Sequence, residues 1–140
     1  AQVTLCQTDL FPSGQASLIV CNPPWLPARP TAPIERAVYD EGGRMLQGWL
    51  SGLAAHLAPG GEAWLVLSDL AERLQLRSRD ALLAAIAAAG LTVAGRADTR
   101  PQHPKAADRR DRLQLARSTE ITSLWRLVRT DAGKALNMVP

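Results

Sequence analysis

Along this chain, the spacing of hydrophobic residues switches repeatedly between the period of a β-strand and that of an α-helix. Apolar runs and apolar–polar alternation predict five strands, at residues 3–8, 17–22, 62–68, 91–97 and 120–129. Apolar residues spaced by three and four predict two helices, over residues 43–57 and from 78 or 79 to 89. The pattern therefore predicts a chain of mixed helices and strands.

Residues at the ends of the helices and on their faces refine this prediction. The stretch Ala58–Gly61 is expected to end the first helix as a glycine C-cap, and Gly90 is expected to end the second. On the second helix, the spacing predicts that Leu82, Leu83 and Ile86 all face the core. Both helices would then be amphipathic elements that pack on a sheet.

The order of the elements is strand, strand, helix, strand, helix, strand, strand. Such alternation predicts an α/β, Rossmann-like fold with a mainly parallel sheet and right-handed crossovers. The last two strands have no convincing helix between them, so they are expected to form an antiparallel hairpin at one edge of the sheet. A length of 140 residues corresponds to one domain, which we place at residues 1–130, with a weakly ordered tail at 131–140.

Composition and cysteine usage narrow the class of protein. With 46% hydrophobic and 21% charged residues, the chain can bury one core. No apolar run approaches the roughly 20 residues of a membrane span, and no signal-peptide pattern opens the chain, so a cytoplasmic protein without membrane contact is expected. Cys6 and Cys21 lie in apolar runs without nearby metal-ligand partners, which predicts buried free thiols and no metal site.

Positive charge is concentrated near the C-terminal end of the chain. The net charge is +3, and residues 96–117 contain seven Lys or Arg against three Asp. Two interpretations of this segment, centred on a long connection at 99–119, remain open. It is either a solvated surface loop or a substrate-recognition loop that contacts phosphates or an acidic protein surface. Residues 109–117 could form one or two helical turns, and His103 has no evident partner for a catalytic role.

Two polar residues follow the first two predicted strands. Asp9 and Asn22 both fall where a strand ends, so a parallel sheet would place them at the same rim. Pro23 and Pro24 fix the backbone after Asn22 and remove two N–H donors, and Trp25 adds an aromatic face. Such a corner can present a carbonyl and an amide to a planar N–H group, while Trp25 stacks on it. The alternative is a rigid loop with Trp25 packed against the sheet.

These residues resemble a known family. The string DLF at 9–11, followed by LIVCNPPW at 18–25, is similar to the third and fourth strands of class I S-adenosylmethionine-dependent methyltransferases. Within them it most resembles the methyltransferase small domain group, which methylates release-factor glutamines and the guanine N2 or adenine N6 of ribosomal RNA. The resemblance extends from about residue 3 to 70, and more loosely to 127.

The resemblance implies a role for each matching residue. It implies that Asp9 and Leu10 contact the adenine of the cofactor S-adenosylmethionine, and that Asn22 lies beside the cofactor as well. It further implies that Asn22 and the Pro23 carbonyl accept hydrogen bonds from the target nitrogen, with Pro24 stiffening the corner and Trp25 stacking on the substrate. The implied reaction is direct methyl transfer to that nitrogen in RNA, another nucleic-acid base or a protein glutamine.

The sequence also departs from the family. The glycine-rich loop that holds the cofactor's methionine and the acidic residue that holds its ribose have no counterpart, since Gly42-Gly43 and Gly60-Gly61 follow no strand. The chain is therefore expected to be the C-terminal portion of a longer enzyme, inactive alone. Its first strand would lack its neighbours and either hang loose, join another chain in a homo-oligomer or find another partner. The alternative function is a non-catalytic, Rossmann-like binding or interaction module.

Overall fold

The computed structural model of the chain describes residues 1–33, 38–102, 109–110 and 114–131. The structure assigns strands β1–β4 and helices α1–α4 within these residues, and a 3-10 turn at Glu41–Gly43 precedes the first helix. In chain order the elements are β1 (Ala16–Cys21), α1 (Arg44–His56), β2 (Leu57–Ser68), α2 (Leu70–Arg73), α3 (Arg79–Ala88), β3 (Leu91–Thr99), α4 (Gln114–Ser118) and β4 (Thr122–Arg129).

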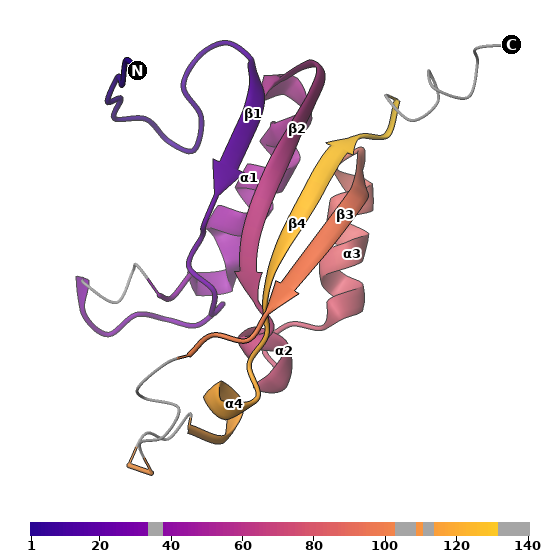
Figure 1. Cartoon of the computed structure of the whole chain (residues 1–140). Coiled ribbons are helices and arrows are strands. Elements are labelled where there is room, and N and C mark those ends of the chain that lie inside the picture. The colour runs from indigo at the N-terminus through magenta and orange to yellow at the C-terminus, as the bar shows by residue number, and fades with distance from the viewer. Residues whose placement is uncertain (34–37, 103–108, 111–113, 132–140) are drawn as a thin grey trace, which may run out of the picture.

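The four strands form one mixed sheet in the order β1-β2-β4-β3. β1 and β2 are parallel, whereas β4 runs antiparallel to both of its neighbours, β2 and β3. Three strands therefore point the same way and only β4 is reversed (Figure 1). The predicted α/β class and the antiparallel pairing of the last two strands are confirmed. The hairpin's second strand lies inside the sheet rather than at its edge.

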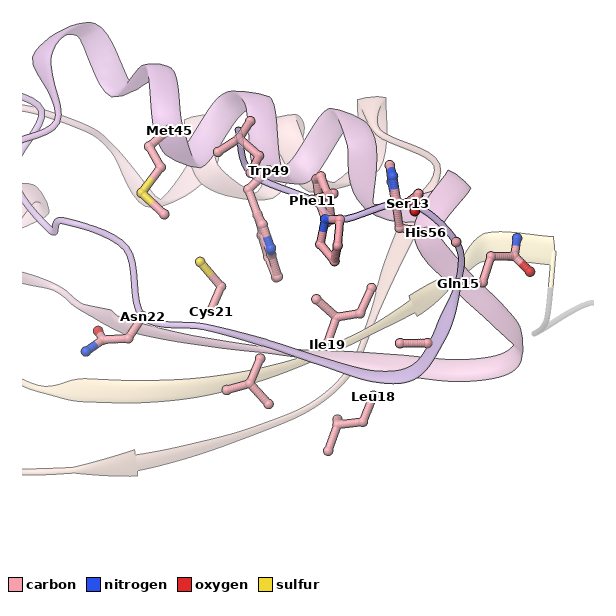
Figure 2. Close-up of a pocket in the computed structure, with 15 residues that line it drawn as sticks. Phe11, Ser13, Gln15, Leu18, Ile19, Cys21, Asn22, Met45, Trp49 and His56 are labelled. Atoms are coloured by element: carbon pink, nitrogen blue, oxygen red, sulfur yellow. The ribbon is translucent and has the colours of Figure 1, made fainter. Parts of the chain in front are cut away.

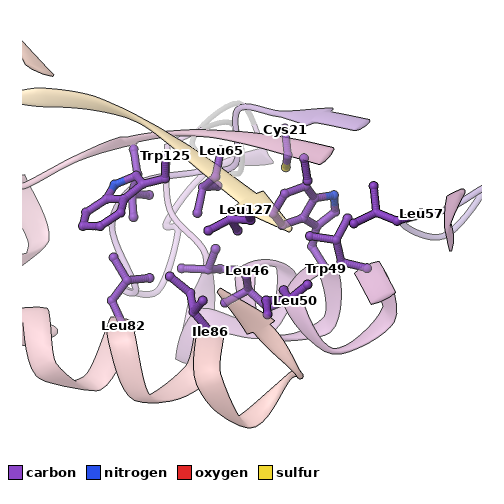
Figure 3. Packing of buried hydrophobic residues seen from close by; sticks show 14 residues of the cluster. Cys21, Leu46, Trp49, Leu50, Leu57, Leu65, Leu82, Ile86, Trp125 and Leu127 are labelled. Atoms are coloured by element: carbon purple, nitrogen blue, oxygen red, sulfur yellow. The ribbon is translucent and has the colours of Figure 1, made fainter. Parts of the chain in front are cut away.

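The larger of two hydrophobic clusters lies between the sheet and the two longer helices. α1 and α3 contact each other on the same side of the sheet (Figure 1). Alternate residues of the strands point toward these helices, as a period of two requires. Figure 3 shows this packing, which includes Leu46, Trp49, Leu50, Leu53, Leu65, Leu82, Ile86, Trp125 and Leu127.

The opposite face of the sheet carries apolar side chains without a covering helix among the described residues. Leu18 and Val20 of β1 are 46% and 58% exposed. Trp64 is half-buried beside them, and its indole N–H donates to Glu62, which also forms an ion pair with Arg126 at 2.7 Å. This face therefore combines an apolar edge with an ion pair at its centre.

Side chains cap the N-termini of both longer helices. The Asp40 carboxylate, which is 8% exposed, accepts hydrogen bonds from the backbone N–H groups of Met45 and Leu46 in the first turn of α1. Ser78 caps α3 by accepting from the N–H of Ala81 at 3.0 Å. At the other end of α3, Gly90 takes the left-handed conformation, with φ of +74°, as predicted for a terminator.

Three sequence-based predictions about the strands and helices are wrong. The segment at 3–8 forms no strand and is exposed throughout, because no neighbouring strand offers backbone hydrogen bonds to it. Leu83 is 40% exposed, because it lies about 100° around the helix axis from the buried Leu82. No glycine caps the first helix: its C-cap is Leu57, already extended, and 58–61 belong to β2.

Other predictions fall partly or wholly outside the described residues. Within the basic connection at 99–119, residues 103–108 and 111–113, including His103 and Lys105, are not described, while α4 supplies a short helix near the place expected. Most of the predicted tail, residues 132–140, also lies outside. Within the described part of the chain, no helix has the length and apolar character needed to cross a membrane.

Candidate functional site

The Asn22–Trp25 corner lies at the carboxyl end of β1. Asn22 is exposed directly after the last residue of the strand, whereas Pro23 is buried and Trp25 is half-buried against the core. Beyond the corner, Leu26 is 2% exposed and pairs with Tyr39 in an isolated parallel bridge. The corner is therefore held on one side by the sheet and on the other by this buried anchor.

Hydrogen bonding fixes the Asn22 amide within the corner. The indole N–H of Trp25 donates to Asn22 Oδ1 at 3.0 Å. An amide oxygen has two lone pairs, so Oδ1 can still accept one further hydrogen bond. Among the described residues, no donor contacts the carbonyl oxygen of Pro23. The corner thus holds two acceptors with remaining capacity, and Trp25 acts as a clamp on the first of them.

A pocket of about 550 Å³ extends along β1 from the Asn22 corner. It lies between β1, α1 and the N-terminal segment that precedes β1 (Figure 2). Figure 2 shows Ile19 and Cys21 pointing toward α1 and Leu18 pointing away from it. The residues along it are Leu10, Phe11, Pro12, Ser13, Gly14, Gln15, Ala16, Leu18, Ile19, Val20, Cys21, Asn22, Met45, Trp49 and His56.

The wall of the pocket opposite β1 is formed by residues 10–15, and it packs closely on α1 at two glycines of that helix. A Cβ at Gly48 would come within 2.8 Å of the Leu10 side chain, and a Cβ at Gly52 within 2.8 Å of the Phe11 ring. Phe11 also stacks on His56, with ring centroids 4.2 Å apart. Sequence reasoning did not find these contacts, although two glycines spaced by four on a helix indicate a face open to close packing.

The predicted cofactor residues are brought together only in part. Leu10 and Asn22 line the same pocket, but Asp9 is exposed outside its lining. None of the lining residues is an Asp, Glu, Lys or Arg. S-adenosylmethionine carries a sulfonium, an ammonium and a carboxylate, and burying these charges requires partners of opposite charge. The residues of this pocket therefore do not fit the whole cofactor.

Burial changes the chemistry of one pocket cysteine. Cys6 is exposed, contrary to the prediction of two buried thiols, whereas Cys21 is buried. Desolvation raises the pKa of the Cys21 thiol from 9.0 to about 11, because a thiolate is poorly solvated there. Cys21 is therefore an inert apolar wall of the pocket rather than a nucleophile.

The raised pKa of the Cys21 thiol predicts slow alkylation of this residue in the folded chain. At pH 8, we expect iodoacetamide to modify Cys21 about 100-fold more slowly in the folded chain than in urea, because a pKa higher by about two units leaves that much less thiolate. The folded rate should rise with pH until it passes the raised pKa. Peptide mass spectrometry measures it, with exposed Cys6 as the internal control. Equal Cys21 rates in the two states would contradict the assignment.

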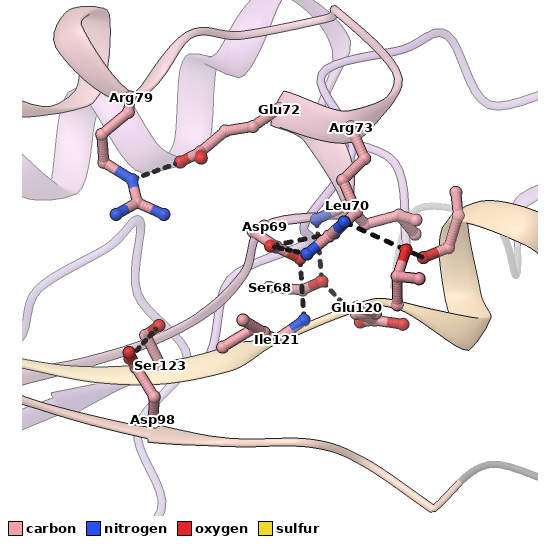
Figure 4. Close-up of polar contacts among 12 residues, drawn as sticks. Ser68, Asp69, Leu70, Glu72, Arg73, Arg79, Asp98, Glu120, Ile121 and Ser123 are labelled. Carbon is pink, nitrogen blue, oxygen red and sulfur yellow. Dashed lines mark hydrogen bonds and ion pairs between the residues drawn. The ribbon is translucent and has the colours of Figure 1, made fainter.

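A second group of polar side chains lies at the carboxyl end of β2 (Figure 4). Ser68 donates to Glu120, and both residues are buried at 2% and 5% exposure. Asp69 accepts from the backbone N–H of Ile121 at 2.8 Å and forms an ion pair with Arg73. Each of these groups forms a hydrogen bond or ion pair with another group at the ends of β2 and β4. The cluster is therefore structural, and none of these groups is left to bind a ligand.

Arg96, the first residue of the basic segment at 96–117, makes contacts within the sheet. Arg96 donates two hydrogen bonds to Asp98, at 2.6 and 2.8 Å, and lies 4.8 Å from the centre of the Trp125 ring. Asp98 also accepts from Ser123. Hydrogen bonding to Arg96 and then to Ser123 lowers the pKa of Asp98, so this carboxylate stays ionised beside the arginine. Arg96 is thus part of the packing of β3 on β4.

The sequence matches no protein-family model, and no curated protein is significantly similar to it. The class of protein that the fold defines is an α/β domain with a mixed four-stranded sheet. Its candidate site is the Asn22–Trp25 corner together with the adjoining pocket.

Proposed function

We propose that this chain carries the substrate-binding side of an S-adenosylmethionine-dependent N-methyltransferase of class I, in the methyltransferase small domain group. The observation that carries the proposal is the corner after β1, where the exposed Asn22 side chain and the Pro23 carbonyl keep free acceptor capacity on a rigid backbone. Two further observations support it. The sheet is mixed, with the reversed strand β4 next to the edge strand β3, and Leu10 and Asn22 line the same pocket.

The corner is suited to hold a planar nitrogen that carries two hydrogens. In an amide or an aryl amine, the nitrogen lone pair is delocalised, so the nitrogen is a weak nucleophile. Two fixed acceptors on its N–H bonds set its orientation and favour the positive charge that grows on it as it is alkylated. Asn22 Oδ1 and the Pro23 carbonyl supply these acceptors. Trp25 holds the Asn22 amide in place. Its ring packs partly against the core, so only the part that stays exposed would serve as the stacking surface that the resemblance implies.

Two substrate classes satisfy this requirement. The exocyclic amine of a nucleic-acid base and the side-chain amide of a protein glutamine are both flat and both carry two N–H donors. The excess of positive charge at residues 96–117 favours RNA or another nucleic acid over protein. The functional test is methyl transfer by the enzyme of the complete reading frame, with and without the Asn22 side chain.

Because the pocket does not fit the whole cofactor, we expect this chain to bind S-adenosylmethionine weakly. In S-adenosylmethionine the activated methyl group is bonded to a sulfonium, and the pocket lining contains no Asp, Glu, Lys or Arg that could balance the cofactor's charges. We expect titration calorimetry of this chain with S-adenosylmethionine to show no saturable binding at micromolar concentrations. One-to-one binding with a micromolar dissociation constant would contradict the inference that the cofactor needs further residues.

One observation favours an alternative function, that of a non-catalytic interaction module. The outer edge of β1 and the face behind it carry exposed apolar residues, which is typical of binding surfaces. An interaction module would not need the Asn22 side chain for catalysis. Unchanged turnover after its removal would therefore favour this alternative over the methyltransferase.

A further inference from the structure

We propose that Asp40 is a positioning residue, which holds the Asn22–Trp25 corner in place beside the first turn of α1. The inference rests on the proposed function, because it gives Asp40 a role in orienting the two acceptors that bind the target nitrogen. Its evidence lies in the hydrogen bonds that join the segment after the corner to α1.

The corner is anchored at the residue that follows it, Leu26. The Leu26 N–H donates to the carbonyl of Val38 at 3.1 Å, and its own carbonyl accepts from the N–H of Asp40 at 2.7 Å. The Leu26 side chain is 2% exposed and packs in a small cluster with Leu70 and Ala71 of α2. Backbone bonds on both sides and a buried side chain therefore fix Leu26 to the segment that carries Asp40.

The side chain of Asp40 connects this segment to α1. Its Oδ1 accepts from the backbone N–H of Met45 at 2.9 Å, and its Oδ2 from that of Leu46 at 3.1 Å. The Asp40 carbonyl accepts from the Gly43 N–H at 2.9 Å. Figure 2 shows Met45 and Asn22 at the same end of the pocket. Asp40 therefore bonds through its N–H, its carbonyl and both carboxylate oxygens, at the place where the corner meets the helix.

The short backbone between Leu26 and Asn22 carries this anchor back to the acceptors. Pro23 and Pro24 fix two φ angles. The indole N–H of Trp25 donates to Asn22 Oδ1 at 3.0 Å, which closes the corner on itself. Because few torsions are left free, a shift at Leu26 would displace both the Asn22 amide and the Pro23 carbonyl.

A buried cation lies within electrostatic range of Asp40. The Nε and Nη2 atoms of Arg77, between α2 and α3, are buried and form no hydrogen bond with the described residues. Burial lowers the pKa of this guanidinium, whereas the nearby carboxylates of Glu72 and Asp40 raise it. An arginine stays charged in proteins, so Arg77 partly balances the charge of the Asp40 carboxylate, which is itself 8% exposed.

The other capped helix supplies a matched control. Ser78 accepts one hydrogen bond, from the N–H of Ala81 at 3.0 Å, at the N-terminus of α3. Its backbone carbonyl accepts from Leu82, so the described contacts of Ser78 stay within α3. Ser78→Ala therefore removes a helix cap, as Asp40→Ala does, but leaves the anchor of the corner intact.

Nuclear magnetic resonance of this chain tests the positioning directly. The indole N–H of Trp25 reports on its bond to Asn22, and its peak is the one that disappears in Trp25→Phe. We expect Asp40→Ala to shift this peak and to lower its heteronuclear NOE, as a more mobile side chain does, while Ser78→Ala changes neither. Asp40→Asn keeps one acceptor oxygen, so it should fold and give a smaller change. An unchanged Trp25 peak in both Asp40 variants, or an equal change in Ser78→Ala, would overturn the proposal.

Turnover by the enzyme of the complete reading frame tests the role in the reaction. We expect Asp40→Ala to lower kcat at least about tenfold with little change in KM, because small displacements of reacting groups are costly. In an Asn22→Ala background, the same substitution should cost less than about threefold, since the main group that it positions is already absent. Equal losses in both backgrounds would overturn the proposal. If the wild-type enzyme transfers no methyl group, the proposed function fails, and the Trp25 peak still decides whether Asp40 positions the corner.

Discussion

Replacement of Asn22 by alanine is expected to lower methyl transfer by at least about 100-fold in the enzyme of the complete reading frame. Loss of a single fixed hydrogen-bonding group that stabilises developing charge typically costs about 100- to 1,000-fold in turnover. In the proposed function the Asn22 amide oxygen would accept a hydrogen bond from one N–H of the target nitrogen, and its loss would leave only the Pro23 carbonyl. The main effect should be on kcat, because the contact strengthens as charge develops on the nitrogen.

The control for this experiment is Gln47→Ala. Gln47 is a polar, exposed residue of α1 that does not line the pocket. We expect near-normal turnover from this variant. Asn22 is itself exposed, so the melting temperature of Asn22→Ala should change little, and a loss of activity cannot be ascribed to unfolding. Wild-type turnover in Asn22→Ala would refute the mechanism.

The largest expected effect on stability comes from two neighbouring leucines of α3. Leu82 is 1% exposed in the core, whereas Leu83 is 40% exposed. Leu82→Ala should lower the free energy of unfolding by about 2–5 kcal/mol, because it removes buried methyl groups and leaves a cavity. Leu83→Ala should lower it by less than about 1 kcal/mol, since alanine has the higher helix propensity and little buried surface is lost.

Urea unfolding of the two variants, followed by circular dichroism, measures this difference. The two substitutions remove the same atoms from adjacent positions of one helix, so each is the control for the other. Equal losses of stability would show that both leucines face the core, as the sequence pattern predicts, and would contradict the orientation of α3 in the structure.

The sequence predicts elements well where burial is one-sided. The apolar run at 17–22 and the spacing over 43–57 correspond to β1 and α1 within one or two residues, because one face of each element packs in the core. The antiparallel pairing of β3 and β4 was predictable from the lack of a crossover helix. The pattern at 3–8 has the same period but forms no strand, because pairing depends on a neighbour that no local pattern supplies.

The candidate site was predictable only at its centre. Asn22 and its two prolines follow an apolar strand, and this local signal placed them at the carboxyl end of β1. The pocket beside them was not predictable, since Phe11 reaches His56 and Gly52 across some 40 residues of chain. The separation of Asp9 from the pocket likewise depends on the path of residues 10–15. Such contacts form between residues that are distant in the chain, so the local pattern of a single sequence does not predict them.

The position of β4 also has a consequence for the order in which the protein can assemble. β4 is the last strand in the chain, yet it lies between β2 and β3, and β3 has no other partner in the described sheet. On the ribosome, β1, α1 and β2 can associate as they emerge, but β3 must wait until residues 122–129 have left the exit tunnel. A nascent chain that stalls before residue 122 would hold an unpaired β3 and a core without Trp125 and Leu127.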